Sequence, residues 1–412
     1  MEDDGASTLD DSAEVRTLRR HLVERGAYIN DAIVCAAMDD GSYRGVKAIR
    51  DLEKDSVLIS IPEALLMSAR SAKRDPAIQR ATQMATRPIT DIQLLAVHLL
   101  HEASKGETSV HHIYLKTLPP SFDNFLFLTD ADVESLASTH PHAAREAAEA
   151  KASLLESFHA VQPILRALSM PKYSTLGAFR WSMACVQSRT MSMGLGDTAG
   201  CLTPWGDLHN HTPMLRPHTP WNDGCIEDDC AAVAGEGFFD EHEQRYVLVT
   251  RVPVQAGRQV FLTYGRLTNL QLLDLYGFVL AENPWDTCRL PLARFPDSIQ
   301  RHLTEEACYL HADGSPSFDL MRAVRLGVLK DAERKRWAGI ILDDRPVDWN
   351  EGDCERRALE TLSNVVLQTI DEDVHTYEAQ RSPVRDWRRA QNNILQRFLC
   401  TSLDTLRRDV SR

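Results

Sequence analysis

Two polar stretches about fifty residues apart carry the side chains of this chain that are best suited to chemistry. The first contains Asp207, Asn210 and His211, and the second ends in Tyr264. Asparagine offers a donor and an acceptor in one planar group, histidine offers a ring nitrogen, and tyrosine offers a hydroxyl. Such groups can hold reactants in line and surround a reacting atom with oriented dipoles, without a strong acid or base. Either stretch alone would be interpreted as a polar loop.

Together, and in this order, the two stretches resemble the halves of a SET methyltransferase active site. The first is similar to the family's D-x-x-N-H motif, and the second, Val260–Asn269, resembles an apolar strand that ends in Tyr-Gly. In that family the two segments pass through one another as a pseudoknot. The resemblance therefore implies that they close around S-adenosylmethionine and a narrow channel for the acceptor side chain.

The resemblance implies a role for each matching side chain. Asn210 and His211 would bind the cofactor, and Asp207 would lie near the substrate mouth or brace the loop. Tyr264 matches the catalytic tyrosine, whose hydroxyl lies beside the transferred methyl group of the cofactor. Tyr276, in a Tyr-Gly-Phe-Val stretch, matches the second aromatic residue of the substrate channel.

A third segment, Tyr43–Leu52, resembles the family's G-x-G-(L/V)-x-A-x-R-D-(I/L) entry, whose main chain meets the cofactor. Arg44, Gly45 and Val46 are therefore expected to bind the cofactor. Tyr43 stands where the family has its first glycine, and a backbone position with positive φ would disfavour a tyrosine there.

A fourth segment, Val186–Met191, is similar to the family's V-x-(S/T)-R helix end. Arg189 maps onto the arginine near the cofactor's carboxylate, for which a planar fork of donors is the natural partner. Met191 is expected to line the substrate channel. Together with Leu58–Ser68, which resembles the family's next strand and turn, these matches indicate the subgroup of the plant Rubisco large-subunit methyltransferase and its animal relatives.

The expected function is therefore that of a SET-class protein-lysine N-methyltransferase, which uses S-adenosylmethionine to methylate the lysine ε-amine of a non-histone protein. Protein-histidine methylation is one alternative. The enzyme of the subgroup with that activity has asparagine near the position of Met191 and a small residue at that of Tyr276, and this chain has neither. A catalytically inactive SET-like scaffold is the other alternative. Tyr43 favours it, whereas the presence of the cofactor and catalytic residues argues against it.

A zinc site is the competing interpretation of the region around the first stretch. His209, His211, His218, Cys225 and Cys230 lie close together in the sequence, and imidazole and thiolate are the usual ligands of zinc. Structural zinc sites favour pairs of closely spaced cysteines, and this region lacks a second pair. We therefore expect no metal.

Composition and charge exclude some functional classes. The 412 residues are 43% hydrophobic and 25% charged, which is ordinary for a globular protein, and the formal net charge is -13. The chain therefore lacks the broad positive field of a nucleic-acid binder, and a basic protein substrate suits its charge better. We expect a monomer that acts on a protein and has no nucleic-acid partner.

Cysteine usage and the first residues indicate a cytoplasmic or nuclear protein. Nine cysteines are scattered without tight spacing, which is typical of reduced intracellular thiols. The first residues are acidic and match neither a signal nor a transit peptide. Because no apolar run approaches the length of a transmembrane helix, we also expect no membrane partner.

The predicted fold belongs to the α+β class. It is a β-rich SET fold with a pseudoknot, split by a helical insertion and followed by an all-α C-terminal domain. We expect an acidic leader and short helix over residues 1–25, the SET domain over 26–282 with its insertion at about 72–172, and the helical domain over 283–412. In this subgroup the last domain binds substrate, and here that role is assigned by analogy.

Patterns of apolar residues predict the elements that must position the polar stretches. Short β-branched runs bounded by turn residues predict strands at Ile33–Ala36, Val46–Ile49, Val57–Pro62, Tyr246–Thr250 and Gln259–Tyr264. Apolar residues at helical spacing predict helices at 15–25, 89–103, 143–168 and 173–192 and two long amphipathic helices near the C-terminus.

Overall fold

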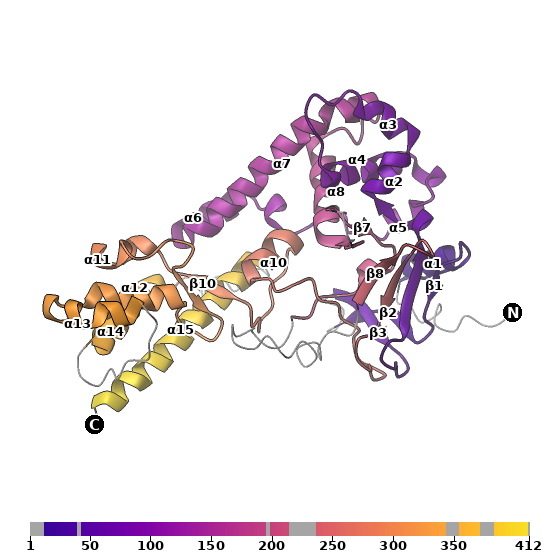
Figure 1. The fold of residues 1–412 in the computed structure, drawn as a ribbon. Helices are drawn as coiled ribbons and strands as arrows, with labels where there is room; N and C mark the ends of the chain where they lie inside the picture. The colour runs from indigo at the N-terminus through magenta and orange to yellow at the C-terminus, as the bar shows by residue number, and fades with distance from the viewer. Residues whose placement is uncertain are drawn as a thin grey trace. The chain divides into compact units, whose positions relative to one another are not determined.

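Figure 1 shows the chain in a computed structural model that describes residues 12–38, 43–194, 198–213, 236–342, 354–370 and 383–410. The chain divides into two units. The first unit contains most of the chain up to Arg266 and the short segment Asp274–Gly277. The second contains Glu134–Pro141, Leu267–Leu273 and the chain from Phe278 onward. Each unit has an apolar core of its own.

Small antiparallel sheets form the β part of the first unit. A four-stranded sheet has the order β1-β4-β9-β8, a two-stranded sheet pairs β2 with β3, and a three-stranded sheet has the order β5-β7-β6. Their bounds are β1 Tyr28–Ile29, β2 Ile33–Met38, β3 Tyr43–Ala48, β4 Val57–Pro62, β5 Met67–Ser68, β6 Thr190–Met191, β7 Cys201–Leu202, β8 Glu236–Asp240 and β9 Arg245–Val249.

The strand β4 lies where its β-branched sequence predicts it. Its pairing with β9 shifts register between Val57 and Ile59, and this irregularity allows the adjacent Leu58 and Ile59 both to be fully buried. Ile61 is buried as well. The strand therefore contributes to the core of the first unit along most of its length.

The hairpin of β2 and β3 explains why Tyr43 can replace the family's glycine. Tyr43 is a regular strand residue that pairs with Met38, and its side chain is exposed. It is not among the described non-glycine residues that have a positive φ. The position therefore does not require a glycine in this chain.

Helices cover the sheets of the first unit. Figure 1 shows that α4 and α8 lie side by side, with α2 beside α4. The helix α1 begins after Ser12, whose hydroxyl accepts the Val15 N–H at 3.2 Å. The helices up to the second polar stretch are α1 Ala13–Val23, α2 Ala69–Arg74, α3 Pro76–Thr82, α4 Asp91–Ser104, α5 His112–Leu115, α6 Asp130–Thr139, α7 Pro141–Ala167 and α8 Leu176–Arg189.

The second unit is mostly helical, but it also contains a pair of strands that the all-α expectation lacked. Strands β10 (Thr287–Arg289) and β11 (Tyr309–His311) are antiparallel, and each places a central residue, Cys288 or Leu310, in the apolar core. Runs of three residues are too short for a periodic signal to reveal them. The helices after the second polar stretch are α10 Asn269–Tyr276, which ends in the first unit, α11 Asp297–Gln300, α12 Phe318–Val328, α13 Asp331–Leu342, α14 Cys354–Thr369 and α15 Pro383–Val410.

The prediction of a continuous strand at Gln259–Tyr264 is wrong. The structure contains isolated bridges here, Lys47 with Gln259 and His211 with Leu262, and assigns no continuous strand. The reason is geometrical, because this segment passes from one backbone partner to another and makes no extended ladder with either of them.

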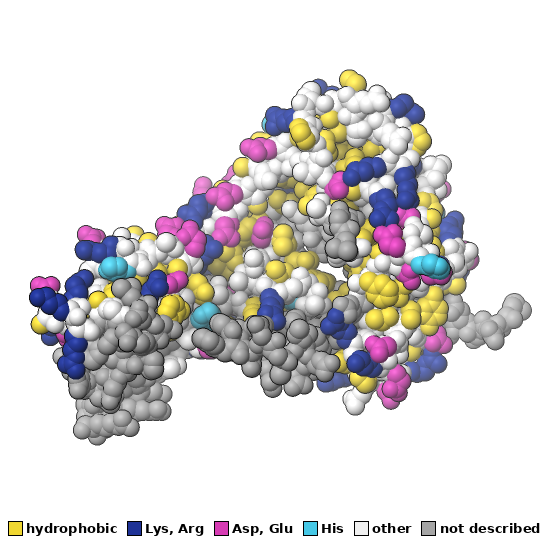
Figure 2. All heavy atoms as spheres, in the orientation of Figure 1, with side chains coloured by type: hydrophobic (Ala, Val, Ile, Leu, Met, Phe, Trp, Pro, Cys, Tyr) yellow, Lys and Arg dark blue, Asp and Glu magenta, His cyan; other side chains and the backbone are white. Residues whose placement is uncertain are grey.

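On the face drawn in Figure 2, basic and acidic side chains are interspersed. Among the helices that the structure describes, none combines the length and the apolar character needed to cross a membrane.

Candidate active site

The two predicted half-sites meet along their backbones. His211 and Leu262 form a parallel bridge, and the Leu262 N–H donates to the Asn210 carbonyl at 2.9 Å. Two residues earlier, the Val260 N–H donates to the Val46 carbonyl at 2.8 Å. The segment around Leu262 therefore joins the entry hairpin to the Asn-His loop.

Tyr264 is fixed by the Asn-His loop through both its side chain and its main chain. The hydroxyl donates to the His209 carbonyl at 2.7 Å, and the N–H donates to Nδ1 of His211 at 3.0 Å. The rings of Tyr264 and His211 are stacked, with centroids 5.0 Å apart. Burial raises the pKa of Tyr264, so its hydroxyl keeps its proton at neutral pH.

Tyr276 extends this stack from the end of α10. Its ring centroid lies 4.7 Å from that of Tyr264, with an angle of 23° between the planes. The chain turns at Gly277, which has a φ of 77°, and a Cβ there would lie 2.9 Å from the Asn124 amide nitrogen. The two tyrosines predicted for catalysis and for the channel are therefore neighbours.

The histidines of the loop are neutral. Burial lowers the pKa of His209 and of His211 to about 4. A neutral imidazole can accept a hydrogen bond, as Nδ1 of His211 does from the Tyr264 N–H. Nδ1 of His209 lies 2.9 Å from the Gly206 carbonyl, an arrangement that requires this nitrogen to carry the proton.

The zinc interpretation can be followed only in part. His218, Cys225 and Cys230 lie outside the described residues. Among the residues that are described, no group of three or more His, Cys, Asp or Glu side chains could hold a metal ion.

Asn210 connects the loop to the predicted entry segment. Its Nδ2 donates to the Arg44 carbonyl at 2.9 Å. The neighbouring Gly45 has no room for a side chain, since a Cβ there would lie 2.5 Å from Asn210 Nδ2 and 2.6 Å from Gln259 Nε2. The Arg44 guanidinium donates to the Thr117 carbonyl at 2.7 Å. Arg44 thus has a structural partner, and its main chain faces Asn210.

Arg189 and Asp207 form a buried ion pair beside the loop. Arg189 Nη1 lies 3.1 Å from Asp207 Oδ2 and 3.2 Å from the Asp207 carbonyl oxygen. The side chains are 20% and 1% exposed, respectively. Tyr114, on α5, donates to the same Oδ2 at 3.0 Å. Asp207 therefore braces the loop, which was one of the two roles expected for it.

Met191 reaches the loop from β6. It pairs with Cys201 of β7 and packs partly buried against the core. A Cβ on Gly206 would lie 3.2 Å from its sulfur, and a Cβ on Gly200 would lie 2.6 Å from its carbonyl oxygen. Met191 thus contacts the start of the loop that carries Asp207.

Trp205 bends the chain into this loop. It has a φ of 71°, which is unusual for a residue with a side chain, and it is fully buried. The guanidinium carbon of Arg19 lies 4.6 Å from the centre of its ring, and Arg19 Nη2 donates to the Ile33 carbonyl at 2.6 Å. Packing thus holds a strained residue next to the predicted site.

Sequence reasoning missed Tyr114, Gln259 and Trp205. The Tyr114–Asp207 hydrogen bond joins residues 93 positions apart, and no local pattern predicts such a contact. The sequence could have indicated Gln259, because this residue directly precedes the apolar run that ends in Tyr264.

The chain is similar in sequence to several known proteins. No protein-family model matches the chain. Curated proteins similar to it include protein SET DOMAIN GROUP 40 of Arabidopsis thaliana (29% identity over 324 residues), ribosomal lysine N-methyltransferase set10 of Schizosaccharomyces pombe (29% over 279) and actin-histidine N-methyltransferase of Mus musculus (27% over 283). The matches cover 76%, 66% and 67% of this chain, but 65%, 46% and 44% of these relatives.

Among solved structures, the chain is similar to the SET domain of LSMT bound to lysine and AdoHcy. The TM-score is 0.62 at 17% identity, over 96% of this chain and 92% of that one. Rubisco LSMT bound to sinefungin and monomethyllysine gives a TM-score of 0.64 at 18% identity, over 97% and 93%. The predicted α+β SET fold is therefore confirmed, and it is similar to that of LSMT.

Proposed function

We propose that this chain, which has the SET fold of the Rubisco LSMT class, transfers a methyl group from S-adenosylmethionine to the ε-amine of a lysine in a non-histone protein. The observation that carries the proposal is the crossing of backbones that brings Asn210, His211 and Tyr264 together. The relatives named as lysine and histidine methyltransferases support transfer to a protein side chain.

The residues around Gly45 fit such a cofactor. Because Gly45 has no side chain, the amide groups of Asn210 and Gln259 approach its main chain closely. Nε2 of Gln259, beside Gly45, and Nε of Arg189, whose guanidinium pairs with Asp207, are buried and have no hydrogen-bond partner within the described part of the chain. Buried donors without partners are uncommon, and a polar ligand would satisfy them.

We therefore assign cofactor binding to Arg44, Gly45 and Val46 through the main chain, and to Asn210 and His211 from the loop. When bound, the cofactor supplies an electrophilic methyl group on a sulfonium. Each of these residues is neutral at its contacting atoms, so the site can orient the cofactor without competing for its methyl group.

Arg189 would supply the positive charge. Its pairing with Asp207 occupies Nη1 and leaves Nε unpaired, so the guanidinium is held in place while another of its donors remains for a carboxylate. We assign this donor to the cofactor's amino-acid end.

Tyr264 would act beside the reacting carbon. Its hydroxyl is oriented by the His209 carbonyl, and its ring by His211. A phenol that keeps its proton presents an oxygen dipole in a fixed direction, which stabilises the transition state without reorganisation. The acceptor ammonium would first lose a proton to solvent. Its neutral nitrogen would then bond to the methyl carbon as the bond from that carbon to sulfur breaks, and S-adenosylhomocysteine would be the leaving group.

The stacked tyrosines support lysine as the acceptor. Aromatic faces favour an ammonium or methylammonium group through cation–π attraction, and Tyr276 provides such a face next to Tyr264. The histidine-modifying enzyme of the subgroup has a small residue at the position of Tyr276 and asparagine near that of Met191. Half-buried Met191 and Tyr276 therefore argue for lysine.

Amino-acid analysis of labelled protein tests this proposal. The full chain is incubated with S-adenosylmethionine labelled in its methyl group and with protein extract from cells that express it, and the labelled protein is hydrolysed. We expect label in methyl-lysine. Label in methyl-histidine would support the alternative acceptor, and tight cofactor binding without any transfer would support a non-catalytic scaffold.

A further inference from the structure

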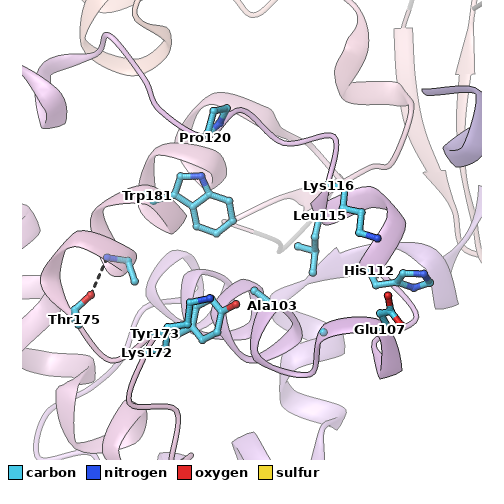
Figure 3. Close-up of a pocket in the computed structure, with 12 residues that line it drawn as sticks. Ala103, Glu107, His112, Leu115, Lys116, Pro120, Lys172, Tyr173, Thr175 and Trp181 are labelled. Atoms are coloured by element: carbon cyan, nitrogen blue, oxygen red, sulfur yellow. Dashed lines mark hydrogen bonds between the residues drawn. The ribbon is translucent and has the colours of Figure 1, made fainter. Parts of the chain in front are cut away.

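A groove of about 870 Å³ lies on the first unit and contains none of the residues assigned above to the active site. It is formed by the end of α4 and the turn after it, by α5, and by the start of α8 with the loop before it (Figure 3). Its volume is within the range of sites that bind small ligands or short segments, about 300–1,000 Å³. Its lining residues are Ala103, Gly106, Glu107, His112, Leu115, Lys116, Pro120, Lys172, Tyr173, Thr175, Ala178 and Trp181.

The centre of the groove is apolar and aromatic. Figure 3 shows the rings of Trp181 and Tyr173 on different sides of the space, with Leu115 between them at its edge. The Trp181 indole N–H donates to the Pro119 carbonyl at 2.9 Å, so this ring is held in one orientation. A tryptophan held in this way, together with a tyrosine, provides a large contact area at a low cost in side-chain entropy.

Two exposed lysines border the groove. Lys116 follows α5 and Lys172 precedes α8, and Figure 3 shows them on different sides of the space. Within the described residues, neither lysine forms an ion pair with a carboxylate, although Lys172 lies 5.6 Å from the centre of the Tyr173 ring. Glu107 is the acidic residue of the lining. In a chain with a net charge of -13, this is a local excess of positive charge.

We propose that this groove binds a short acidic segment of a separate partner protein, with one bulky apolar side chain inserted between Trp181 and Tyr173. Carboxylates on either side of that side chain would meet Lys116 and Lys172, so charge complementarity identifies the occupant. This inference does not depend on the methyl transfer proposed above.

A nucleotide is the other occupant that aromatic rings and lysines could suggest. Its phosphates would carry several negative charges at one point, whereas the two lysines lie apart and Glu107 lies on the same side as Lys116 (Figure 3). An open surface with separated charges suits an extended peptide better, because each carboxylate of a peptide can meet its own lysine.

Binding of synthetic peptides to the full chain tests the proposal. The first peptide has eight residues, with a central Phe flanked by Asp and Glu. A second has Lys in place of the acidic residues, and a third has Ser in place of Phe. Affinity is measured by calorimetry, and fluorescence reports the environment of the tryptophans. We expect binding of the first peptide to be at least about tenfold tighter than that of either control, and to weaken as salt is added.

Charge reversal locates the site. Lys116→Glu and Lys172→Glu each change an exposed side chain, so the fold should persist, and we expect each to weaken the acidic peptide about tenfold. Lys54→Glu, an exposed lysine outside the groove, is the matched control and should leave the affinity unchanged. Circular dichroism confirms that all three variants fold. Equal binding of acidic and basic peptides, unchanged affinity in both groove variants, or a preference for ATP over the acidic peptide would each overturn the proposal.

Discussion

Tyr264 is the residue whose hydroxyl distinguishes the catalytic interpretation from a purely structural one. We expect Tyr264→Phe to lower turnover about a hundredfold to a thousandfold, because the variant lacks the hydroxyl dipole that we propose to lie beside the reacting carbon. The variant also leaves the His209 carbonyl without its donor at 2.7 Å, which should reduce the free energy of unfolding by about 1 kcal/mol. Transfer of labelled methyl groups and urea unfolding measure the two effects.

Tyr28→Phe is the matched control, since the Tyr28 side chain is 48% exposed. Neither its activity nor its stability should change. If Tyr264→Phe transferred methyl groups at the rate of the unaltered chain, Tyr264 would have no place in the mechanism.

Gly45 provides a second test at the scale of one residue. In Gly45→Ala the new Cβ would lie 2.5 Å from Asn210 Nδ2 and 2.6 Å from Gln259 Nε2, so both amides must move. We expect the free energy of unfolding to fall by about 1–3 kcal/mol, and calorimetry should show weaker binding of S-adenosylmethionine. Gly339→Ala lies in α13 with no atom within 4 Å of its Cβ, and should stabilise the chain by up to about 1 kcal/mol. Unchanged cofactor affinity in Gly45→Ala would contradict the assignment of this segment.

At the scale of elements, α5 supports the loop through the Tyr114–Asp207–Arg189 network. Asp207→Asn leaves the Arg189 guanidinium buried without its carboxylate, and we expect a loss of about 3–5 kcal/mol in unfolding free energy. Tyr114→Phe keeps the ion pair and removes one hydrogen bond, so it should cost about 1 kcal/mol. Urea unfolding of both variants measures the difference. Equal losses would show that the ion pair does not support the loop.

The elements that the sequence could predict are those whose signal is local. The turn-bounded run Val57–Pro62 is strand β4, and the hairpin around Tyr43 is present as β2 and β3. The two-residue strands β6 and β7 could not be predicted, because pairing between Met191 and Cys201 depends on how distant segments pack. The same holds for the positive φ of Trp205, which Arg19 stabilises from α1.

At the scale of the whole molecule, buried histidines predict how stability depends on pH. Burial lowers the pKa of His111, His209 and His211 from 6.5 to about 4. In this interval the unfolded chain binds more protons than the folded chain, so these residues add stability above pH 6.5 that is lost as the pH falls towards 4. Asp274 and Asp286, whose pKa burial raises to about 6, act in the opposite direction.

The histidines outnumber these aspartates, so we expect the free energy of unfolding to decrease from pH 7 to pH 4.5. Urea titrations at several pH values measure it. The decrease should be smaller in His111→Gln, which lies outside the candidate site and removes one of the titrating groups. A stability that rose as the pH fell over this range would contradict the burial of these rings.

The residues of the site could be predicted much better than their supports. The Asn-His and Tyr-Gly stretches carry a resemblance that can be detected in the sequence alone, and the structure joins them. Tyr114 carries no such signal, because its contact with Asp207 joins segments separated by many residues. The groove between α5 and α8 could not be predicted from the sequence either, because residues that are distant in the sequence line it.

The joining of distant segments in the site affects the order in which the parts of the chain refold. The bond from Asn210 to the Arg44 carbonyl closes a loop of 166 positions, and contacts between distant residues form slowly because the entropy of loop closure opposes them. The helices rely on local contacts and should form first. In stopped-flow refolding, the far-ultraviolet circular dichroism of the helices should therefore recover before the capacity to bind S-adenosylmethionine, and newly synthesised chains should pass through a helical state that cannot yet hold the cofactor.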